Sequence, residues 1–253
     1  MRIVFLIASS GGYKYQAISI GQSLTWLKRR PKNVLVYRVV GNGKLGKGAP
    51  TRFALHNPQN YGNAPMSGFN TVQAIRKNML IVDSSTGWDQ ILTNSISAFD
   101  WVDRNMDYDF VIRTNISTYW NIPVLKDLLD KVKEPFFYAG NVANNLGQTY
   151  VEGDGIIMSR DTVKALLTNL SKIDSSIIDD VSIGMTLKML NITPKHLPRP
   201  WVRKFRQAIS VESLNESYSV RCKAEYSKGN FTVRIDPLIM KVIHNRISVF
   251  TKK

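Results

Sequence analysis

The stretch "DYDFVIRTNISTYWN", Asp107 to Asn121, contains an apolar run, a polar loop and the start of a helix. The run "DFVIRT", residues 109–114, has the length and β-rich composition of a buried strand. Asn121 can cap a helix, and Pro123 can occupy its first turn. A loop between a strand and a helix often carries the functional residues of an α/β protein. The loop itself, residues 113–117, reads RTNIS and contains no carboxylate.

The same alternation of strand and helix extends over roughly the first 195 residues. Further runs with the character of strands are Arg2 to Ala8, Asn33 to Val40, Asn78 to Ser84 and Pro135 to Val142. Apolar residues three and four apart predict helices over Trp88 to Asn105 and after Asn121, Ser159 and Asp180. This order predicts an α/β fold with a mostly parallel sheet flanked by helices.

The chain changes character after residue 195. Prolines and a dense Arg/Lys run interrupt the periodicity in "TPKHLPRPWVRKFRQ". Two later runs, "FTVRI" at residues 231–235 and "LIMKVI" at residues 238–243, then predict short strands. We expect one domain over residues 1–253, in which residues 196–253 form a basic C-terminal segment.

Composition indicates an ordinary globular protein that attracts anions. The chain has 253 residues, of which 43% are hydrophobic, and a formal net charge of +15. Such a charge favours nucleic acid, acidic lipid headgroups or phosphate-bearing substrates as partners. Cys222 is the only cysteine, which excludes an intrachain disulfide and favours a reducing compartment. The apolar run near the N-terminus is too short to span a membrane, so we expect a cytoplasmic protein.

Several common site motifs do not occur. The glycines of "SSGGYKY" follow the first strand but lack the spacing of dinucleotide-binding and P-loop motifs. There is no Gly-X-Ser-X-Gly nucleophile elbow. The histidines, His56, His196 and His244, are too scattered for a metal motif borne on one helix.

Two segments rich in small and acidic residues remain as candidates for chemistry. In "YVEGDGIIMSRD", Gly153 and Gly155 flank Asp154, which is compatible either with a tight turn or with a loop whose backbone approaches a ligand. In "IIDDVSIGMTLKMLNI", Asp179 and Asp180 stand at the start of a helix. One acid there is explained by helix capping, whereas two exceed that need and suggest a general base.

Several segments, in order along the chain, resemble the Fringe and β-1,3-galactosyl- and N-acetylglucosaminyltransferase family. Residues 83–121 resemble a family stretch that passes through a helix ending in Trp to Phe-Val-Leu-Lys-Thr-Asp-Asp-Asp-Val-Phe-Val-Asn. "YAGNV" resembles the strand before the family's acceptor loop, and "YVEGDGIIMSRD" resembles Tyr-X-Ser-Gly-X-Gly-Tyr-Val-Leu-Ser-Arg-Asp. "IDDVSIGMTLKMLNI" resembles the family's Glu/Asp-Asp-Val segment. The match covers about Asn78 to Ile192 and is specific in its combination.

The resemblance implies a GT-A fold and an inverting, nucleotide-sugar-dependent hexosyltransferase. Residues 1–120 would then be the nucleotide-binding half and residues 121–195 the acceptor and catalytic half. Asp180 would be the base, and Asp179 would orient the acceptor or the helix. Gly153, Asp154 and Gly155 would line the acceptor side of the donor sugar. The donor itself would be bound by Asp83, Arg113, Asn115 and Ser117.

The family's acidic triplet binds the nucleotide and its manganese, and this chain has Asn115, Ile116 and Ser117 in its place. Neutral oxygens bind a dication weakly, which favours transfer without a metal over transfer with Mn²⁺ or Mg²⁺. Arg113, Arg203 and Arg206 would neutralise the diphosphate, unless they are solvated surface charges. His244 matches a metal-binding histidine of the family, and its alternative role is structural.

We therefore expect a UDP-sugar as donor and a glycan or glycolipid as acceptor, with peripheral association at the membrane face. One alternative is a degenerate fold of this type that binds a nucleotide sugar or glycan without turnover. A second is a nucleic-acid binder, suggested by the net charge of +15. No recognised nucleic-acid-binding module supports the second alternative.

Overall fold

The computed structural model describes residues 1–9, 13–41, 72–76, 78–84, 90–145, 147–210, 212–228 and 231–250. The chain forms two compact units, each assembled from segments distant in sequence. Unit 1 comprises Met1–Gly11, Asn33–Thr114 and Glu134–Leu197, and unit 2 comprises Gly12–Lys32, Asn115–Lys133 and Pro198–Lys253. The expected single domain, with divisions after residues 120 and 195, stays a prediction.

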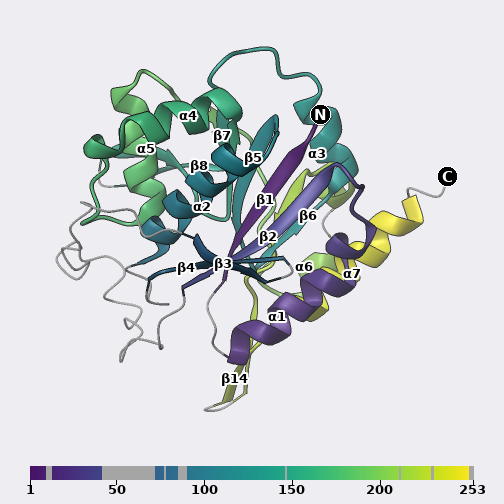
Figure 1. Cartoon of the computed structure of the whole chain (residues 1–253). Helices are drawn as coiled ribbons and strands as arrows, with labels where there is room; N and C mark the ends of the chain where they lie inside the picture. The colour runs from purple at the N-terminus through teal and green to yellow at the C-terminus, as the bar shows by residue number, and fades with distance from the viewer. Residues whose placement is uncertain are drawn as a thin grey trace. The chain divides into compact units, whose positions relative to one another are not determined.

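Unit 1 is built on an eight-stranded sheet with the order β11-β7-β10-β5-β1-β2-β4-β3 (Figure 1). Its strands are β1 (Ile3–Ala8), β2 (Val34–Gly41), β3 (Val72–Arg76), β4 (Met79–Val82), β5 (Phe110–Asn115), β7 (Tyr138–Gly140), β10 (Gly155–Ser159) and β11 (Lys195–His196). β1 and β2, β2 and β4, and β11 and β7 pair in parallel. β10 is antiparallel to β5 and β7, and β3 is antiparallel to β4. The predicted α/β class is confirmed.

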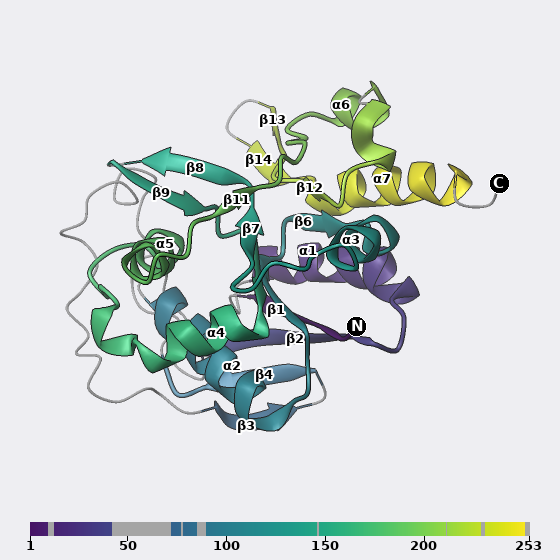
Figure 2. The ribbon, with the colours of Figure 1, turned by 90° about the horizontal axis from the view of Figure 1, so that it is seen from above.

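Two helices of unit 1, α2 (Ile91–Asn105) and α4 (Arg160–Thr168), pack against this sheet (Figure 2). A third helix, α5 (Asp179–Met189), packs against α2, α4 and the strand β9. The short helix η5 (Leu170–Lys172) follows α4. The predicted apolar stripe of α2 is buried in the core at Leu92, Ile96, Phe99 and Val102. A hairpin of β8 (Val142–Asn145) and β9 (Gln148–Val151) connects β7 to the turn before β10.

Unit 2 consists of helices and two small antiparallel ribbons. Its helices are α1 (Tyr13–Leu24), η1 (Trp26–Arg29), α3 (Ile122–Leu129), α6 (Phe205–Ser210), η6 (Glu212–Asn215) and α7 (Asp236–Phe250). β6 (Thr118–Trp120) pairs with β12 (Ser219–Arg221), and β13 (Glu225–Lys228) pairs with β14 (Phe231–Arg234). α1 and α7 pack closely, because a Cβ on Gly21 would lie only 2.9 Å from the Cα of Pro237.

One sequence-based prediction for unit 2 is confirmed and one is wrong. "FTVRI" contains β14, as predicted. "LIMKVI", residues 238–243, belongs to α7 and is not a strand. The buried residues Ile239, Met240, Ile243 and Ile247 share one face of that helix. A six-residue apolar run does not by itself separate a strand from a buried helix, and the helix start at Asp236-Pro237 was the missed signal.

Within the described part of the chain, none of the helices combines the length and the apolar character that crossing a membrane requires.

Candidate active site

The strand order of the unit 1 sheet reverses at β1. From β1 the chain proceeds to β2 and β4 on one side, and β5 then returns to the other side of β1. Open α/β sheets bind ligands at such a reversal, in the crevice outside the carboxyl ends of the strands. The last residues of β5 that belong to unit 1 are Arg113 and Thr114. The topology therefore places these two residues where a binding site is expected.

Arg113 forms an ion pair with Asp179, the first residue of α5. The side chains of the two residues are 6% and 5% exposed. Nη1 of Arg113 also donates a hydrogen bond to the main-chain oxygen of Gly153. Removing either member of a buried ion pair is destabilising, because the remaining charge is buried without a compensating one. The pair thus fixes the start of α5 against β5 and the Gly153 turn.

Asp180, the second residue of α5, is half-buried beside this ion pair. Its Oδ2 accepts a hydrogen bond from the Gly153 N–H at 2.8 Å, and its Oδ1 accepts one from the Val181 N–H at 2.9 Å. Burial and, second, the negative charge of Asp179 raise the pKa of Asp180 to about 7. A carboxylate with this pKa can accept a proton near neutral pH.

Helix capping does not account for the acidic pair. The N-cap position of α5 is Ile178, and no side chain caps the helix there. Both aspartates lie in the first turn, where negative charge is favourable to the helix dipole. The specific partners of Asp179 and Asp180 are, however, Arg113 and the Gly153 turn. Of the two adjacent carboxyl groups, that of Asp179 is ion-paired and that of Asp180 has a raised pKa. Such a difference between neighbouring carboxyl groups is typical of acid–base sites.

The Gly153-Asp154-Gly155 segment forms the tight turn that the sequence left open. The Gly155 N–H donates to the Glu152 oxygen at 3.2 Å, and the Thr114 hydroxyl donates to the Asp154 oxygen at 2.7 Å. A Cβ on Gly153 would lie 2.5 Å from Nη1 of Arg113 and 3.2 Å from Oδ2 of Asp180. Glycine is therefore required here by the close approach of these two side chains. The predicted contact of this turn with an acceptor stays a prediction.

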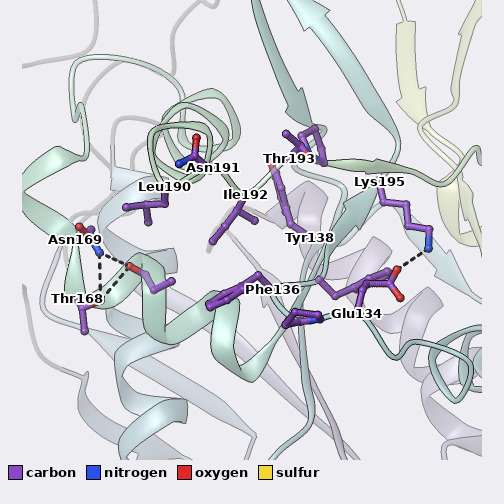
Figure 3. A pocket seen from close by; sticks show the side chains of 14 residues that line it. Glu134, Phe136, Tyr138, Thr168, Asn169, Leu190, Asn191, Ile192, Thr193 and Lys195 are labelled. Atoms are coloured by element: carbon purple, nitrogen blue, oxygen red, sulfur yellow. Dashed lines mark hydrogen bonds and ion pairs between the residues drawn. The ribbon is translucent and has the colours of Figure 1, made fainter.

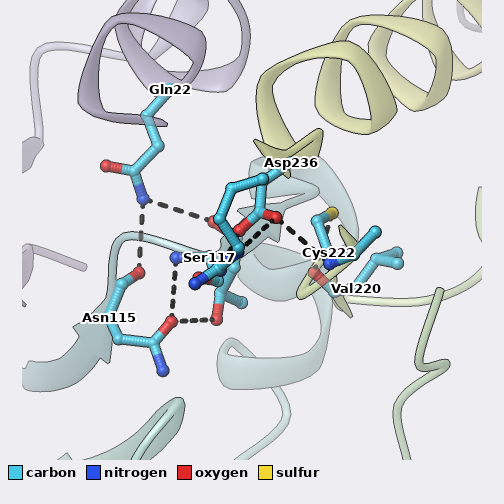
Figure 4. Close-up of polar contacts among 9 residues, drawn as sticks. Gln22, Asn115, Ser117, Val220, Cys222 and Asp236 are labelled. Carbon is cyan, nitrogen blue, oxygen red and sulfur yellow. Dashed lines mark hydrogen bonds and ion pairs between the residues drawn. The ribbon is translucent and has the colours of Figure 1, made fainter. Parts of the chain in front are cut away.

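In unit 2, the loop that carries Asn115 and Ser117 is held by its own polar groups (Figure 4). Oδ1 of Asn115 accepts hydrogen bonds from the Ser117 N–H at 2.9 Å and from the Thr118 hydroxyl at 3.2 Å. The main-chain oxygen of Asn115 accepts one from Gln22 at 3.3 Å. The Asn115 side chain thus shapes the loop, and the neighbouring Ile116 is buried.

Arg234 is a residue of this region that the sequence analysis missed. Its Nη2 donates to Oγ of Ser117 at 2.8 Å, and its Nε donates to Oδ1 of Asp236 at 3.0 Å. Asp236 is fully buried and also accepts the Ala224 N–H at 3.1 Å. An arginine two residues before a helix-starting Asp-Pro, in "VRIDP", was the only sequence signal. A guanidinium therefore contacts the loop at which the resemblance places a metal-binding triplet.

The residues proposed as metal ligands do not fit a manganese or magnesium site. The Arg234 guanidinium donates a hydrogen bond to Oγ of Ser117. Its positive charge would repel a metal cation bound at the same oxygen. Nδ1 of His244 is 3.0 Å from the Tyr119 hydroxyl. Burial and the charge of Arg29 lower the pKa of His244, and the contact of the ring with Tyr119 gives this histidine a structural role. Among the described residues, no cluster of three His, Cys, Asp or Glu side chains could hold a metal ion.

Three other predicted site residues lie on the exposed surface. Asp83 follows β4 in unit 1, whereas Arg203 and Arg206 lie just before and in α6 of unit 2. Arg203 stacks on the ring of Trp201, with its guanidinium carbon 3.7 Å from the ring centroid. The predicted contacts of these residues with a donor stay predictions.

Unit 1 also contains a cavity of about 710 Å³ that is separate from the Arg113–Asp180 cluster (Figure 3). It is lined by Glu134–Tyr138, Ala165, Thr168, Asn169 and Leu190–Lys195. Phe136 and Asn191 in its wall have positive φ angles of 54° and 61°. None of the predicted site residues lines this cavity, so it is not part of the candidate active site.

No protein-family model and no curated protein matches the sequence. Among solved structures, the chain is similar to the glycosyltransferase GlyE of Streptococcus pneumoniae TIGR4, with 11% identity, a TM-score of 0.44 and coverage of 99% of this chain and 64% of GlyE. It is also similar to the galactosyltransferase LgtC in complex with donor and acceptor sugar analogues, with 9% identity, a TM-score of 0.45 and coverage of 97% and 96%. A third similar structure is the bifunctional IspDF of Campylobacter jejuni, with 10% identity, a TM-score of 0.37 and coverage of 78% and 49%.

Proposed function

We propose that the protein is an inverting GT-A glycosyltransferase. It would move a hexose from a UDP-sugar donor to a hydroxyl group of a glycan or a lipid-linked glycan. The proposal is carried by the Asp179–Asp180 pair at the start of α5. Asp179 is ion-paired with Arg113, and the pKa of Asp180 is raised by burial and by Asp179 to about 7. This gives a general base at the position where the resemblance to the Fringe family implies one.

In the proposed reaction, Asp180 takes the proton of the acceptor hydroxyl. The acceptor oxygen then forms a bond to the anomeric carbon, while the bond from that carbon to the diphosphate breaks and the nucleoside diphosphate leaves. The N–H groups of Gly153 and Val181 hold the two oxygens of Asp180, and each oxygen keeps a lone pair for the proton. Arg113 does not need to touch substrate in this scheme, because its role is to hold Asp179 and the turn.

We further propose that the protein supplies the counter-charge for the diphosphate from arginine and not from a bound metal. Arg234 contacts Ser117, which stands where the family's acidic triplet would be. A guanidinium is suited to this role because it stays charged and donates several hydrogen bonds to phosphate oxygens. Its pairing with the buried Asp236 fixes its orientation.

The test is a comparison of Asp180→Asn with the wild type. A panel of UDP-, GDP- and dTDP-sugars is first screened by thermal shift, because a ligand that binds the folded protein raises its Tm. Release of the nucleoside diphosphate is then followed for the donors that bind, with and without glycan acceptors. We expect Asp180→Asn to lose about 100-fold or more in turnover and to keep donor affinity.

Asp127→Asn on α3 is the matched control, since Asp127 is exposed and lies on a helix of unit 2. This control should leave turnover unchanged. Donor binding without any turnover in the wild type would instead support the binding-only alternative. Turnover that survives Asp180→Asn would exclude Asp180 as the base.

A further inference from the structure

The segment Trp201–Ile209 of unit 2, "WVRKFRQAI", exposes three large apolar side chains. Trp201 is 43% exposed, Phe205 is 40% exposed and Ile209 is 55% exposed. Phe205 and Ile209 are four residues apart in α6 and therefore share one side of that helix. Single exposed apolar residues are ordinary, but three of them within nine residues concentrate apolar exposure on one segment, which makes it a candidate for interaction.

Cations are interleaved with these apolar residues. Arg203, Lys204 and Arg206 are exposed, and the segment contains no acidic residue. Within the described part of the chain, none of the three forms an ion pair with a carboxylate. We define the Trp201–Ile209 surface as these three cations together with Trp201, Phe205 and Ile209.

The inner side of the same segment is fixed to unit 2. Val202 and Ala208 are fully buried, and the Val202 N–H donates to the Arg221 oxygen at 2.8 Å. Oε1 of Gln207 accepts the N–H groups of Arg203 and Lys204, at 2.8 and 3.0 Å, which caps the start of α6. Nη1 of Arg246 donates to the Ala208 oxygen at 2.9 Å, at the other end of the helix. The exposed apolar side chains are therefore presented by an anchored segment.

We propose that the Trp201–Ile209 surface docks the protein onto a membrane that contains anionic lipids. Trp and Phe are favoured at the headgroup level of a bilayer, where an apolar side chain enters the acyl region and neighbouring cations meet lipid phosphates. The net charge of +15 on the chain has the same sign as the patch, so long-range attraction to an anionic membrane acts in the same direction. This proposal does not rest on the proposed transferase activity.

The pattern favours a lipid surface over nucleic acid. Single-stranded nucleic acid binds through bases that stack on aromatic faces. Here Arg203 covers one face of Trp201 at 3.7 Å, and the most exposed apolar residue of the surface is Ile209, which has no ring for a base to stack on. The proposal also differs from the predicted role of Arg203 and Arg206 in holding a donor diphosphate, and the experiment separates the two.

The experiment is co-sedimentation of the full chain with vesicles of phosphatidylcholine alone or mixed with phosphatidylglycerol, at low and high salt. The protein should bind the mixed vesicles and not the neutral ones, and salt should weaken the binding. Arg203→Gln/Lys204→Gln/Arg206→Gln should reduce binding by about 100-fold, since each of the three cations near the surface contributes about a factor of five. Trp201→Ser/Phe205→Ser/Ile209→Ser should reduce it by about tenfold or more.

The matched control is Ile20→Ser/Leu24→Ser on α1, which removes two apolar side chains that are 58% and 67% exposed elsewhere in unit 2. It should bind vesicles like the wild type. A milder variant, Trp201→Phe, keeps an aromatic ring at this exposed position and tests the same contact. Mixed vesicles should shift the tryptophan emission of the wild type to the blue, and this shift should be lost in the variant.

Equal vesicle binding by the wild type and both triple variants would overturn the proposal. So would a loss of vesicle binding in the α1 control alone. Binding of a single-stranded oligonucleotide or of UDP that depends on Arg203 and Arg206, in the absence of vesicle binding, would assign the surface to those ligands instead.

Discussion

Arg113 pairs with Asp179, and Asp179 stands next to Asp180 in the first turn of α5. The Arg113 cation, the Asp179 carboxylate and the titratable carboxyl group of Asp180 therefore lie in sequence. The Asp179 charge raises the pKa of Asp180, whereas the Arg113 charge and the N–H groups of Gly153 and Val181 lower it. This relationship leads to several tests of the site.

Asp179→Asn is expected to lower the pKa of Asp180 from its value of about 7, because the variant removes a like charge and keeps Arg113. The acid limb of the pH–rate profile should then move to lower pH. Turnover at pH 6 relative to pH 8 is the measurement. Asp174→Asn, an exposed aspartate before α5, is the control and should keep the wild-type profile. If the pH–rate profile of Asp179→Asn matched that of the wild type, the acid limb of the profile would be set by a group other than Asp180.

Arg113→Met is expected to have the opposite effect on the pKa of Asp180, since it removes a charge that lowers it. The acid limb should move to higher pH. The variant also leaves Asp179 buried without its partner, which costs roughly 3–5 kcal/mol of unfolding free energy. Urea unfolding measures this cost, and Arg113→Met/Asp179→Leu should recover part of it. If the double variant were less stable than Arg113→Met, the loss of the ion pair between Arg113 and Asp179 would not explain the cost of the single variant.

Asp180→Asn is expected to change stability in a pH-dependent way. The folded pKa of Asp180, about 7, is raised above the ordinary value, so the wild type loses stability as the pH rises from about 4 towards 7. The variant lacks this titration. Its Tm relative to the wild type should therefore be higher at pH 8 than at pH 5. A Tm difference that is constant over this range would mean that the carboxyl group does not titrate there.

Gly153→Ala is expected to reduce turnover by about 100-fold, because an added Cβ would meet Arg113 at 2.5 Å and displace Asp180. Single-turnover rates measure this loss, and donor affinity should change little. Gly147→Asn is the control: Gly147 has a φ of 72° and open space around it, and asparagine tolerates that backbone conformation. Wild-type activity in Gly153→Ala would show that the turn can relax without moving the base.

Donor binding is expected to survive a chelator, because the residues in place of the acidic triplet supply no carboxylate to hold a dication. Arg234→Gln should weaken the binding of a UDP-sugar by about tenfold or more, and Arg234→Lys should recover part of it. Isothermal titration with and without EDTA measures both effects. Loss of binding on chelation, together with wild-type affinity in Arg234→Gln, would contradict the role of Arg234.

The α/β class was predictable because strand and helix periodicities are local. The four apolar positions of α2 and the buried run of β1 appear in the sequence at the spacing that their structures require. The error at residues 238–243 has the same origin, since a six-residue run carries too little periodicity to separate a strand from α7. The candidate base was found through two adjacent acids at a helix start and through resemblance.

By itself, the sequence determined the α/β class of the fold and the acids at the start of α5. Only the tertiary structure decided which groups these acids meet. Asp179 is 66 residues from Arg113 and Asp180 is 27 from Gly153, so their contacts depend on how β5, the turn and α5 assemble. The same holds for Ser117 and Arg234, which are 117 residues apart. A pKa near 7 for Asp180 results from burial and from neighbouring charges, and both are properties of the assembled fold.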